Sequence, residues 1–286
     1  MKIYNTYFSA TNTTRTIIKA ITKVIGAETL NYNVTSKKLE EEIRLSSDDV
    51  LLVGMPVYGG RIPTAAINSL QQFKGTHSRA ILVAVYGNRE FDDVFVEMQD
   101  ILEANGFYII AAGAFIAQHS VFPHTAQGRP DILDLQKIAE FGTCCKRLIQ
   151  QGSMSESHNT NEGSNTENQE DTQDVKCAQN SRDEKASYQS ISLPGHRPYK
   201  IPGNIPLKII IDDTCTDCGT CVKTCPTSAI STDNPHITDY ERCIHCGHCI
   251  YICHEHARHY GGLLYKVVGA AFGWKNRKRK EPQFFF

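Results

Sequence analysis

Eight cysteines in the last quarter of the chain form two runs with the same spacing, Cys215-x2-Cys218-x2-Cys221-x3-Cys225 and Cys243-x2-Cys246-x2-Cys249-x3-Cys253. Three thiolates on one short loop can bind three irons of a [4Fe–4S] cube, while the fourth cysteine of a run is carried to the other cube. The spacing therefore predicts two cubes and makes electron transfer the first hypothesis. A fold that is cross-linked through iron is expected to form only with the metal.

The crossing rule assigns a ligand set to each cube. Cluster 1 takes Cys215, Cys218, Cys221 and Cys253, and cluster 2 takes Cys243, Cys246, Cys249 and Cys225. In this spacing the segment resembles a bacterial-type two-cluster ferredoxin. Pro226 follows Cys225, as the ferredoxin pattern often has it, whereas His254 follows Cys253. Because hydrogen bonds near the sulfurs influence the reduction potential, we expect the two cubes to differ in potential.

A zinc module is the rival interpretation of the same segment. Five histidines among or just after the cysteines could complete tetrahedral sites: His245, His248, His254, His256 and His259. Structural zinc usually takes ligand pairs separated by a dozen or more residues, whereas each run here packs four cysteines closely, so the spacing disfavours zinc. A disulfide framework is also disfavoured, because the start of the chain does not resemble a secretory signal. We expect a reducing, cytoplasmic location.

The rest of the chain leaves room for a second domain. With 286 residues, 41% of them hydrophobic, the chain can bury an ordinary core. A net charge of −1 gives no global attraction to nucleic acid, and no apolar run has the length of a membrane span. Composition divides the chain into a first domain (1–150), a low-complexity, disordered insertion (151–193), a Pro/Gly-rich connector (194–206), the cysteine-rich, ferredoxin-like domain (207–260) and a basic tail (261–286).

The apolar pattern of residues 1–150 alternates between strand and helix periodicity. Strands are expected at Lys2–Phe8, Thr29–Thr35, Asp49–Met55, Arg79–Tyr86 and Phe107–Ala117. Helices are expected at Thr14–Ile25, Pro63–Phe73, Phe91–Asn105 and Asp131–Gln150. Continuous apolar runs such as Ile81–Val85 are typical of parallel strands buried on both faces. The pattern predicts an α/β fold with a doubly wound, five-stranded parallel sheet.

Ligands of such folds bind beyond the carboxyl ends of the strands, which makes three loops candidates. The first opens a helix whose unpaired N–H groups and hydroxyls can bind a phosphate, and it contributes Ser9, Thr11, Asn12, Thr13 and Thr14. Simple helix capping is the alternative role for these side chains. The other two loops set an aromatic residue beside glycine, and they contribute Pro56, Val57, Tyr58, Gly59, Tyr86, Gly87, Asn88 and Phe91. Ordinary turn chemistry is the alternative there.

Together the three loops resemble the flavodoxin pattern, and the whole chain resembles the flavodoxin–ferredoxin fusion proteins of anaerobic microbes. The resemblance implies an FMN whose phosphate sits on Ser9–Thr14. It also implies that the isoalloxazine lies between Pro56–Gly60 and Tyr86–Phe91, in contact with the tyrosine of each loop. Asn12 stands where flavodoxins usually carry glycine. Because asparagine tolerates a left-handed backbone, we expect weakened rather than abolished FMN binding.

These features predict an iron–sulfur flavoprotein in which two [4Fe–4S] clusters exchange electrons with FMN and onward with a redox protein partner. The alternative is a ferredoxin-type carrier whose flavodoxin-like domain is a docking module without FMN. No catalytic acid, base or nucleophile is evident, so activity as an oxidoreductase stays open. A third, weaker alternative is a zinc-dependent nucleic-acid module that uses the basic tail.

Several remaining features have simpler expected roles. The segment Leu263–Trp274 and the basic residues after it resemble an amphipathic tail. Contact with anionic lipid or an acidic partner is one interpretation, and a solvated tail is the favoured one. Cys144 and Cys145 are expected to pack within a helix, and Cys177 to be a free thiol. His119, after the fifth strand, is expected to face solvent or cap a turn.

Overall fold

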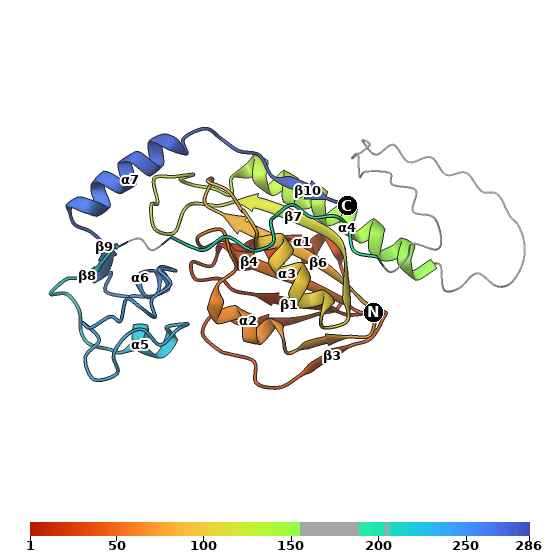
Figure 1. Ribbon diagram of the computed structural model, residues 1–286, viewed down its shortest axis with the longest axis horizontal. Helices are drawn as coiled ribbons and strands as arrows, with labels where there is room; N and C mark the ends of the chain where they lie inside the picture. Colours follow the sequence, from red (N-terminus) through yellow and green to blue (C-terminus); the bar gives the residue numbers. More distant parts are fainter. Residues whose placement is uncertain (155–188, 204–205) are drawn as a thin grey trace, which may run out of the picture.

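In the computed structural model of the protein, residues 1–154, 189–203 and 206–286 are described. Their main sheet has the strand order β2-β1-β4-β6-β7-β10 (Figure 1). Its strands are β1 (Ile3–Tyr7), β2 (Thr29–Asn33), β4 (Val50–Pro56), β6 (Ser78–Tyr86), β7 (Phe107–Ile116) and β10 (Gln283–Phe285). The first five are parallel and follow the flavodoxin-like order, in which the second strand lies at one edge and the first beside it. The predicted α/β fold is confirmed.

Helices cover both faces of this sheet. On one face, α1 (Thr13–Ile25) packs against α4 (Ile132–Met154) over a cluster that includes the fully buried Ile18 and Phe141. On the other face, α2 (Thr64–Leu70) and α3 (Val94–Glu103) bury Leu70 and Phe95. All residues of β4 and β6 are buried, as continuous apolar runs between two helix layers require.

Two short strands, β3 (Ile43–Leu45) and β5 (Phe73–Gly75), form a separate parallel pair. Phe73 was expected to end a helix, but α2 stops at Leu70. Phe73 instead packs its fully buried ring edge-on against Tyr32. Three-residue strands carry too little periodicity to stand out in a sequence.

The cysteine-rich segment forms a compact module beside the sheet (Figure 1). It contains the antiparallel pair β8 (Ile209–Ile211) and β9 (Arg258–Tyr260). Two short helices, α5 (Thr220–Thr224) and α6 (His248–Tyr251), pack against each other within it. A longer helix, α7 (Leu263–Lys275), follows the module. After this helix the chain returns to the large sheet and forms strand β10.

Strand β10 adds an antiparallel sixth strand to the β7 edge of the sheet. Phe284 and Phe286 pack against Phe141 on one face, whereas Phe285 packs against Phe95 on the other. This alternation follows the two-residue period of a strand. The expectation of a solvated tail is therefore wrong for this end of the chain.

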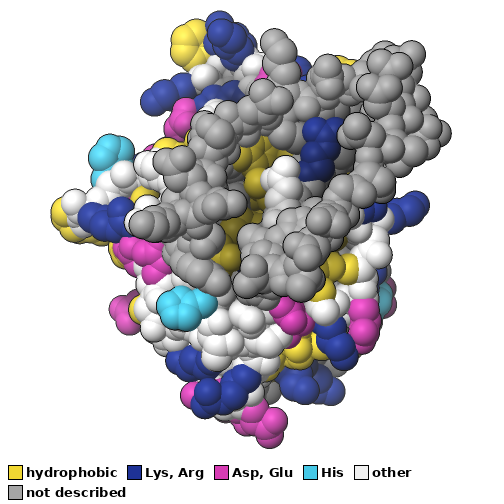
Figure 2. All heavy atoms as spheres, turned by 90° about the vertical axis from the view of Figure 1, so that its right-hand side faces the viewer, with side chains coloured by type: hydrophobic (Ala, Val, Ile, Leu, Met, Phe, Trp, Pro, Cys, Tyr) yellow, Lys and Arg dark blue, Asp and Glu magenta, His cyan; other side chains and the backbone are white. Residues whose placement is uncertain are grey.

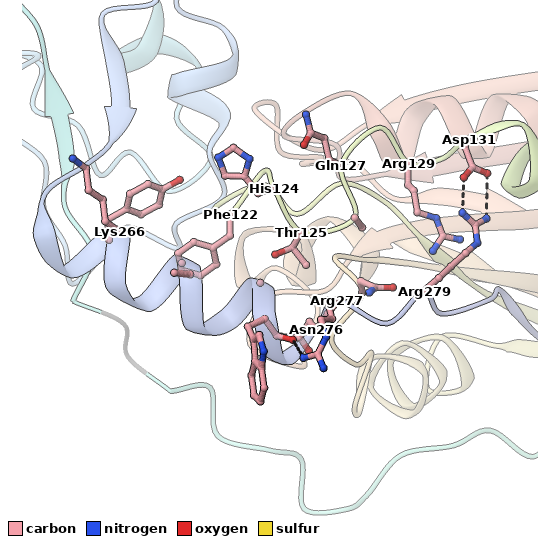
Figure 3. Close-up of a pocket in the computed structure, with 17 residues that line it drawn as sticks. Phe122, His124, Thr125, Gln127, Arg129, Asp131, Lys266, Asn276, Arg277 and Arg279 are labelled. Atoms are coloured by element: carbon pink, nitrogen blue, oxygen red, sulfur yellow. Dashed lines mark hydrogen bonds and ion pairs between the residues drawn. The ribbon is translucent and has the colours of Figure 1, made fainter.

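Polar contacts hold the same segment to the flavodoxin-like domain. Arg279 pairs with Asp131, as Figure 3 shows, and Lys280 pairs with Glu90. The Asn88 amide donates to the carbonyl oxygens of Asn276 and Lys278 at 2.7 and 2.9 Å. Two cations of the basic tail therefore form ion pairs with carboxylates of the same chain.

The connector before the module is held as well. The Ile191 N–H donates to the Ile109 carbonyl at 3.0 Å, so residues of the predicted insertion already lie along β7. Further on, the His196 and Lys200 N–H groups donate to the Asp93 carboxylate at 2.8 and 2.6 Å. The module is consequently tied to the flavodoxin-like domain through the chain on both of its sides.

Neither sign of charge dominates the face of the molecule drawn in Figure 2. On the face in Figure 2, Lys and Arg side chains alternate with Asp and Glu around the residues drawn in grey, in keeping with the net charge of −1. Within the described residues, no helix combines the length and apolar character needed to cross a bilayer.

Cysteines outside the two runs differ from one another. Cys145 is a buried free thiol whose pKa is raised by burial, in agreement with helix packing. Cys144 takes part in a disulfide bond, so the expectation of simple packing is wrong for it. Cys177 lies outside the described residues.

Candidate functional site

A cleft of about 650 Å³ opens at the carboxyl ends of β1, β4 and β6. This size is in the usual range of small-molecule sites, and the position is the switch point of the strand order, where ligands bind in such sheets. Residues 117–122 after β7 form one part of its walls. The rest is formed by Lys200, Pro202 and Gly203 of the connector and by Leu207, Tyr240, Glu241, Cys243, Ile244 and His245 of the cysteine-rich module. The cleft therefore lies between the two domains.

The turn after β1 leaves hydrogen-bond donors free at the start of α1. Ser9 Oγ accepts the Arg15 N–H at 3.0 Å, which makes Ser9 a cap of the helix. Asn12 adopts the left-handed conformation, with φ of 64°. Among the described residues, no acceptor is found for the backbone N–H groups of 11–14, and the first helical turn carries no acidic side chain. These donors, with the hydroxyls of Thr11 and Thr13 beside them, form a cradle for an anion.

The loop after β4 is held in a fixed shape beside the cleft. Tyr58 and Arg61 exchange two backbone hydrogen bonds of 2.9 and 3.1 Å. The Arg61 guanidinium binds the Glu97 carboxylate through two contacts of 2.7 Å. Gly59 has φ of 62°, and a Cβ there would come within 2.8 Å of Pro202 in the connector. Glycine is thus required by both the turn and the chain that crosses it.

Only some residues of the loop after β6 line the cleft, and the others contact the C-terminal segment or the core. Tyr86 and Gly87 line the cleft, and the His119 ring covers Gly87 so closely that a Cβ would collide with it. Burial raises the pKa of Tyr86 to about 12. Asn88 instead holds the C-terminal segment, and Phe91 packs in the core edge-on against Tyr86.

Most of the cofactor-binding residues predicted from sequence meet at this cleft. Its lining includes Thr11, Thr13, Thr14, Pro56, Val57, Tyr58, Gly59, Tyr86 and Gly87. Four others lie outside the lining: Ser9, Asn12, Asn88 and Phe91. Ser9 and Asn12 stabilise the conformation of the turn without lining the cleft. Asn88 and Phe91 instead contact residues near the end of the chain.

A cluster of rings that the sequence analysis did not assign to the site forms one wall. His119, Phe122 and Phe272 lie with ring centroids 4.8 to 5.4 Å apart. His119 Nδ1 accepts the N–H groups of Val121 and Phe122 at 3.1 Å each, which leaves the ring proton on Nε2. Burial lowers the pKa of His119 to about 4. Of the two expected roles, capping a turn is confirmed and facing solvent is wrong.

A second cavity of about 660 Å³ lies under α7, against the segment 122–131 (Figure 3). Phe122 borders both cavities, and Asn88 borders this one. The Thr125 hydroxyl is buried here without a hydrogen-bond partner among the described residues. Apart from Asn88, none of the predicted cofactor-binding residues lines it.

The cysteine-rich module repeats its own backbone. Left-handed conformations occur in each half at matching positions, in the pairs Asp217 and His245, Gly219 and Gly247, and Ser228 and His256. The members of each pair have the same offset as the corresponding cysteines of the two runs. Alternation of left- and right-handed residues turns successive N–H groups inward, which suits binding of a negatively charged sulfur cluster. Both halves therefore carry a loop of the same design.

Four thiols surround one small cavity in the module. It is lined by Cys225 of the first run, by Cys243, Cys246 and Cys249 of the second, and by apolar side chains such as Ile209, Ile230 and Ile244. Burial raises the pKa of Cys246 to about 12 and that of Cys249 to about 11. Four convergent thiols in apolar surroundings fit an iron–sulfur cluster, whose iron would have to displace their protons.

The other predicted ligand set lies closer to solvent. Cys218 is exposed and Cys215, Cys221 and Cys253 are half-buried. The Thr220 hydroxyl and N–H lower the pKa of Cys218. A carboxylate, Asp217, and His236 lie near Cys215, but both are exposed and pair with each other at 2.9 Å. The two cysteine sets therefore differ clearly in their access to solvent.

Arg258 lies between the two sets and is almost fully buried, with 2% of its surface exposed. Its Nη1 is 3.7 Å from Cys221 Sγ and donates to the Pro235 carbonyl at 2.8 Å, while the guanidinium also hydrogen-bonds Cys249. Its Nε has no partner among the described residues. A buried cation thus touches one thiol of each predicted cluster.

The thiol cavity and the large cleft share a wall. Cys243, Ile244 and His245 line both. The Nδ1–H of His248 donates to the carbonyl of Ala10, in the turn after β1, at 2.8 Å. Cys246 belongs to the same packed cluster as Tyr58 and lies close enough to raise its pKa further, although burial is the main cause of that increase. The two candidate cofactor sites are therefore direct neighbours.

Comparison with protein-family models identifies the cysteine-rich segment. A family model described as the 4Fe-4S dicluster domain matches residues 200–257. No curated protein matches the chain. The residues outside that match include the whole parallel sheet, which has the flavodoxin-like strand order.

Several solved flavin-protein structures resemble the chain weakly. An archaeal flavodoxin is 14% identical over 52% of this chain and 99% of its own, with a TM-score of 0.37. The FMN-bound flavodoxin of Fusobacterium nucleatum is 17% identical over 51% and 97%, with a TM-score of 0.36. RosB with a bound riboflavin-phosphate intermediate is 14% identical over 64% and 98%, with a TM-score of 0.37. The assignment of the fold rests on the strand order and not on these scores.

The fold and the two sites define an α/β domain of flavodoxin type joined to a cysteine-rich electron-transfer module. More particularly, the chain combines a flavodoxin-like domain with a 4Fe-4S ferredoxin-type domain, as the resemblance to flavodoxin–ferredoxin fusion proteins implied. Iron–sulfur electron transfer is accordingly the general role of this chain.

Proposed function

We propose that this chain is an iron–sulfur flavoprotein that relays electrons between two [4Fe–4S] clusters and one FMN, and onward to a redox protein partner. The observation that carries the proposal is the shared wall, because Cys243, Ile244 and His245 line both the thiol cavity and the cleft. A cluster and a flavin held at these sites are separated by one loop. The dicluster family model and the FMN of the Fusobacterium nucleatum flavodoxin support the two cofactor types.

The phosphate end of FMN belongs on the turn after β1. The free N–H groups of residues 11–14 and the hydroxyls of Thr11, Thr13 and Thr14 donate to phosphate oxygens without any lysine. Asn12 keeps the turn in its left-handed conformation. Ser9 holds the helix start in place by capping it.

The ring end of FMN belongs between the loops after β4 and β6. Tyr58 and Tyr86 supply aromatic and apolar surface, and Gly59 and Gly87 let the backbone approach closely. The wall formed by Phe122 and its neighbouring rings keeps water from one side. When bound, FMN supplies one- and two-electron chemistry, whereas each iron–sulfur cluster supplies single electrons.

The two cysteine sets receive different tasks in this proposal. Cys225, Cys243, Cys246 and Cys249 hold the cluster next to the flavin. Cys215, Cys218, Cys221 and Cys253 hold the outer cluster, where the exposed Cys218 marks the side that a redox protein can reach. Arg258 lies between the sets and stabilises negative charge on both.

The first experiment is anaerobic purification followed by assays of iron, acid-labile sulfide, zinc and extractable FMN. The proposal expects about eight irons and eight sulfides per chain, as two cubes require, with one FMN. Cys246→Ser should remove about half of the iron. Cys145→Ser changes a buried free thiol outside both sets and should leave the iron content intact.

Other outcomes separate the alternatives. Iron and sulfide without FMN would favour the ferredoxin-type carrier with a docking domain. Gly87→Leu, which fills the cleft beneath His119, should remove FMN while iron is retained. Zinc without sulfide would overturn the proposal.

A further inference from the structure

Helix α7 has one face packed on the protein. Tyr265, Val268 and Phe272 contact the cluster around Phe122. Gly269 allows this close approach, since a Cβ there would lie 3.1 Å from the Phe122 ring. The apolar residues of this inner face therefore pack on the segment after β7, beside the cavity under α7.

The opposite face of α7 is apolar and largely exposed, and its Trp274 ring carries the Arg277 guanidinium 4.6 Å above its centroid. Exposed fractions are 79% for Leu263, 50% for Leu264, 59% for Val267 and 69% for Trp274. With 3.6 residues per turn, these side chains and the exposed Ala270 and Ala271 fall on one continuous stripe. A helix that is apolar on all sides is normally buried on all sides, so this stripe is expected to be covered.

The charges around the stripe are all positive. By the same helical geometry Lys266 lies along one border and Lys275 along the other, and Arg277 and Lys278 follow the end of the helix. Figure 3 shows Lys266 on α7 and Arg277 beyond its end. No Asp or Glu occurs from 261 to 280. The stripe is therefore framed by cations.

We propose that α7 attaches the protein to an anionic lipid surface, lying in the plane of the membrane with its outer stripe in the lipid. Lysines on both borders can extend their ammonium groups to lipid phosphates while their methylenes stay in the apolar layer. Trp274 sits at the end of the stripe, beside the basic residues, where an indole suits the headgroup region. The contacts of β10 and of Arg279 hold α7 to the body, so the whole molecule would follow the helix to the surface.

A lipid surface is a better binding partner for this stripe than an acidic protein, because the stripe is long and uniformly apolar. It runs along the whole helix without a carboxylate or a polar side chain to fix the register of a partner, and of its residues Ala270 and Trp274 border the cavity under α7. Figure 1 places α7 at the outer edge of the molecule, where a flat surface can approach it. Anionic headgroups attract each of the cations that frame the stripe, which strengthens the attachment.

The test is co-sedimentation of the full-length, cofactor-loaded protein with vesicles of phosphatidylcholine alone or with one quarter phosphatidylglycerol. We expect binding to the anionic vesicles only, weakened by salt. Trp274 is the single tryptophan of the chain, so its emission should shift to the blue on binding. Val267→Glu should reduce the bound fraction at least tenfold. Ile237→Glu alters an equally exposed apolar residue of the cysteine-rich module and should bind like the unchanged protein.

Iron content and far-UV circular dichroism of both variants show whether they are folded. Absence of binding to anionic vesicles by the folded protein would overturn the proposal, as would equal binding to both vesicle types. Equal loss of binding in the two variants would do the same. Binding of an acidic protein through α7 without any vesicle binding would reassign the stripe to a protein partner.

Discussion

At the scale of single residues, Arg258 is a buried cation next to thiols of both predicted clusters, and its charge should influence their reduction potential. A buried guanidinium is costly unless negative charge compensates it, and among the described residues its hydrogen bonds go to Pro235, Thr238 and thiols rather than to a carboxylate. Deprotonated, metal-bound thiolates would supply that charge. Arg258 is thus suited to hold clusters whose charge becomes more negative on reduction.

Replacing Arg258 by Met should therefore lower the midpoint potential of the clusters. Loss of a nearby buried cation disfavours the more negative reduced state, and we expect a decrease of about 60 mV or more, which for one electron equals a tenfold change in the equilibrium constant. Redox titration monitored by electron paramagnetic resonance measures it. Arg258→Lys keeps the charge and should retain most of the potential. A Met variant that holds both clusters at unchanged potential would contradict this role.

His119 gives the flavodoxin-like domain a specific pH dependence. Its pKa in the folded state is about 4, below the ordinary value of 6.5, because burial and then the nearby Arg89 disfavour the charged ring. The unfolded state therefore binds a proton first as pH falls, and stability that is complete above pH 6.5 is lost between pH 6.5 and 4. The loss is at most about 3.4 kcal/mol. His119→Asn keeps an acceptor for the two N–H groups but cannot titrate.

Urea unfolding at a series of pH values, with both proteins carrying the same iron and flavin content, measures this effect. We expect the unfolding free energy of the unchanged chain to fall more steeply than that of His119→Asn in this interval. Parallel curves would show that His119 does not control the acid sensitivity.

At the scale of elements, the central strands were predictable because burial on both faces demands continuous apolar runs, as in Ile81–Val85. The left-handed turn at Asn12 was predictable because few other residues tolerate it. The roles of Asn88 and Phe91 were not, since their partners in the last ten or so residues lie about 190 positions away. No local sequence pattern predicts such a contact. Strand β10 was not predicted for the same reason, because its aromatic residues form a strand only by pairing with the distant β7.

Strand β10 should contribute measurably to stability. Phe284 is half-buried and packs 5.2 and 5.8 Å from the rings of Phe141 and Phe115. Phe284→Ala should reduce the unfolding free energy by about 1–2 kcal/mol, less than the 3–5 typical of a fully buried phenylalanine. Gln283→Ala, an exposed position on the same strand, should change it by less than about 0.5 kcal/mol. Urea unfolding followed by circular dichroism measures both, and equal values would contradict the packing of β10.

At the scale of the whole molecule, the cysteine-rich module is fixed to the cleft of its own chain. The connector binds Asp93 on one side, the C-terminal segment joins β7 on the other, and His248 bonds Ala10 directly at the junction. The sequence left open whether one chain's flavin lies beside its own clusters, because an insertion of that length permits exchange between protomers. The contacts at the junction favour a relay completed within one chain.

Electron transfer from the clusters to FMN should consequently be independent of protein concentration. After rapid reduction of the clusters, the rate of flavin reduction should stay constant over a hundredfold dilution, whereas transfer between molecules would slow in proportion. Stopped-flow absorbance measures this rate. A mixture of Cys246→Ser, which lacks the cluster beside the cleft, with Gly87→Leu, which lacks flavin, should not restore it. Restored transfer in the mixture would show that the module of one chain serves the cleft of another.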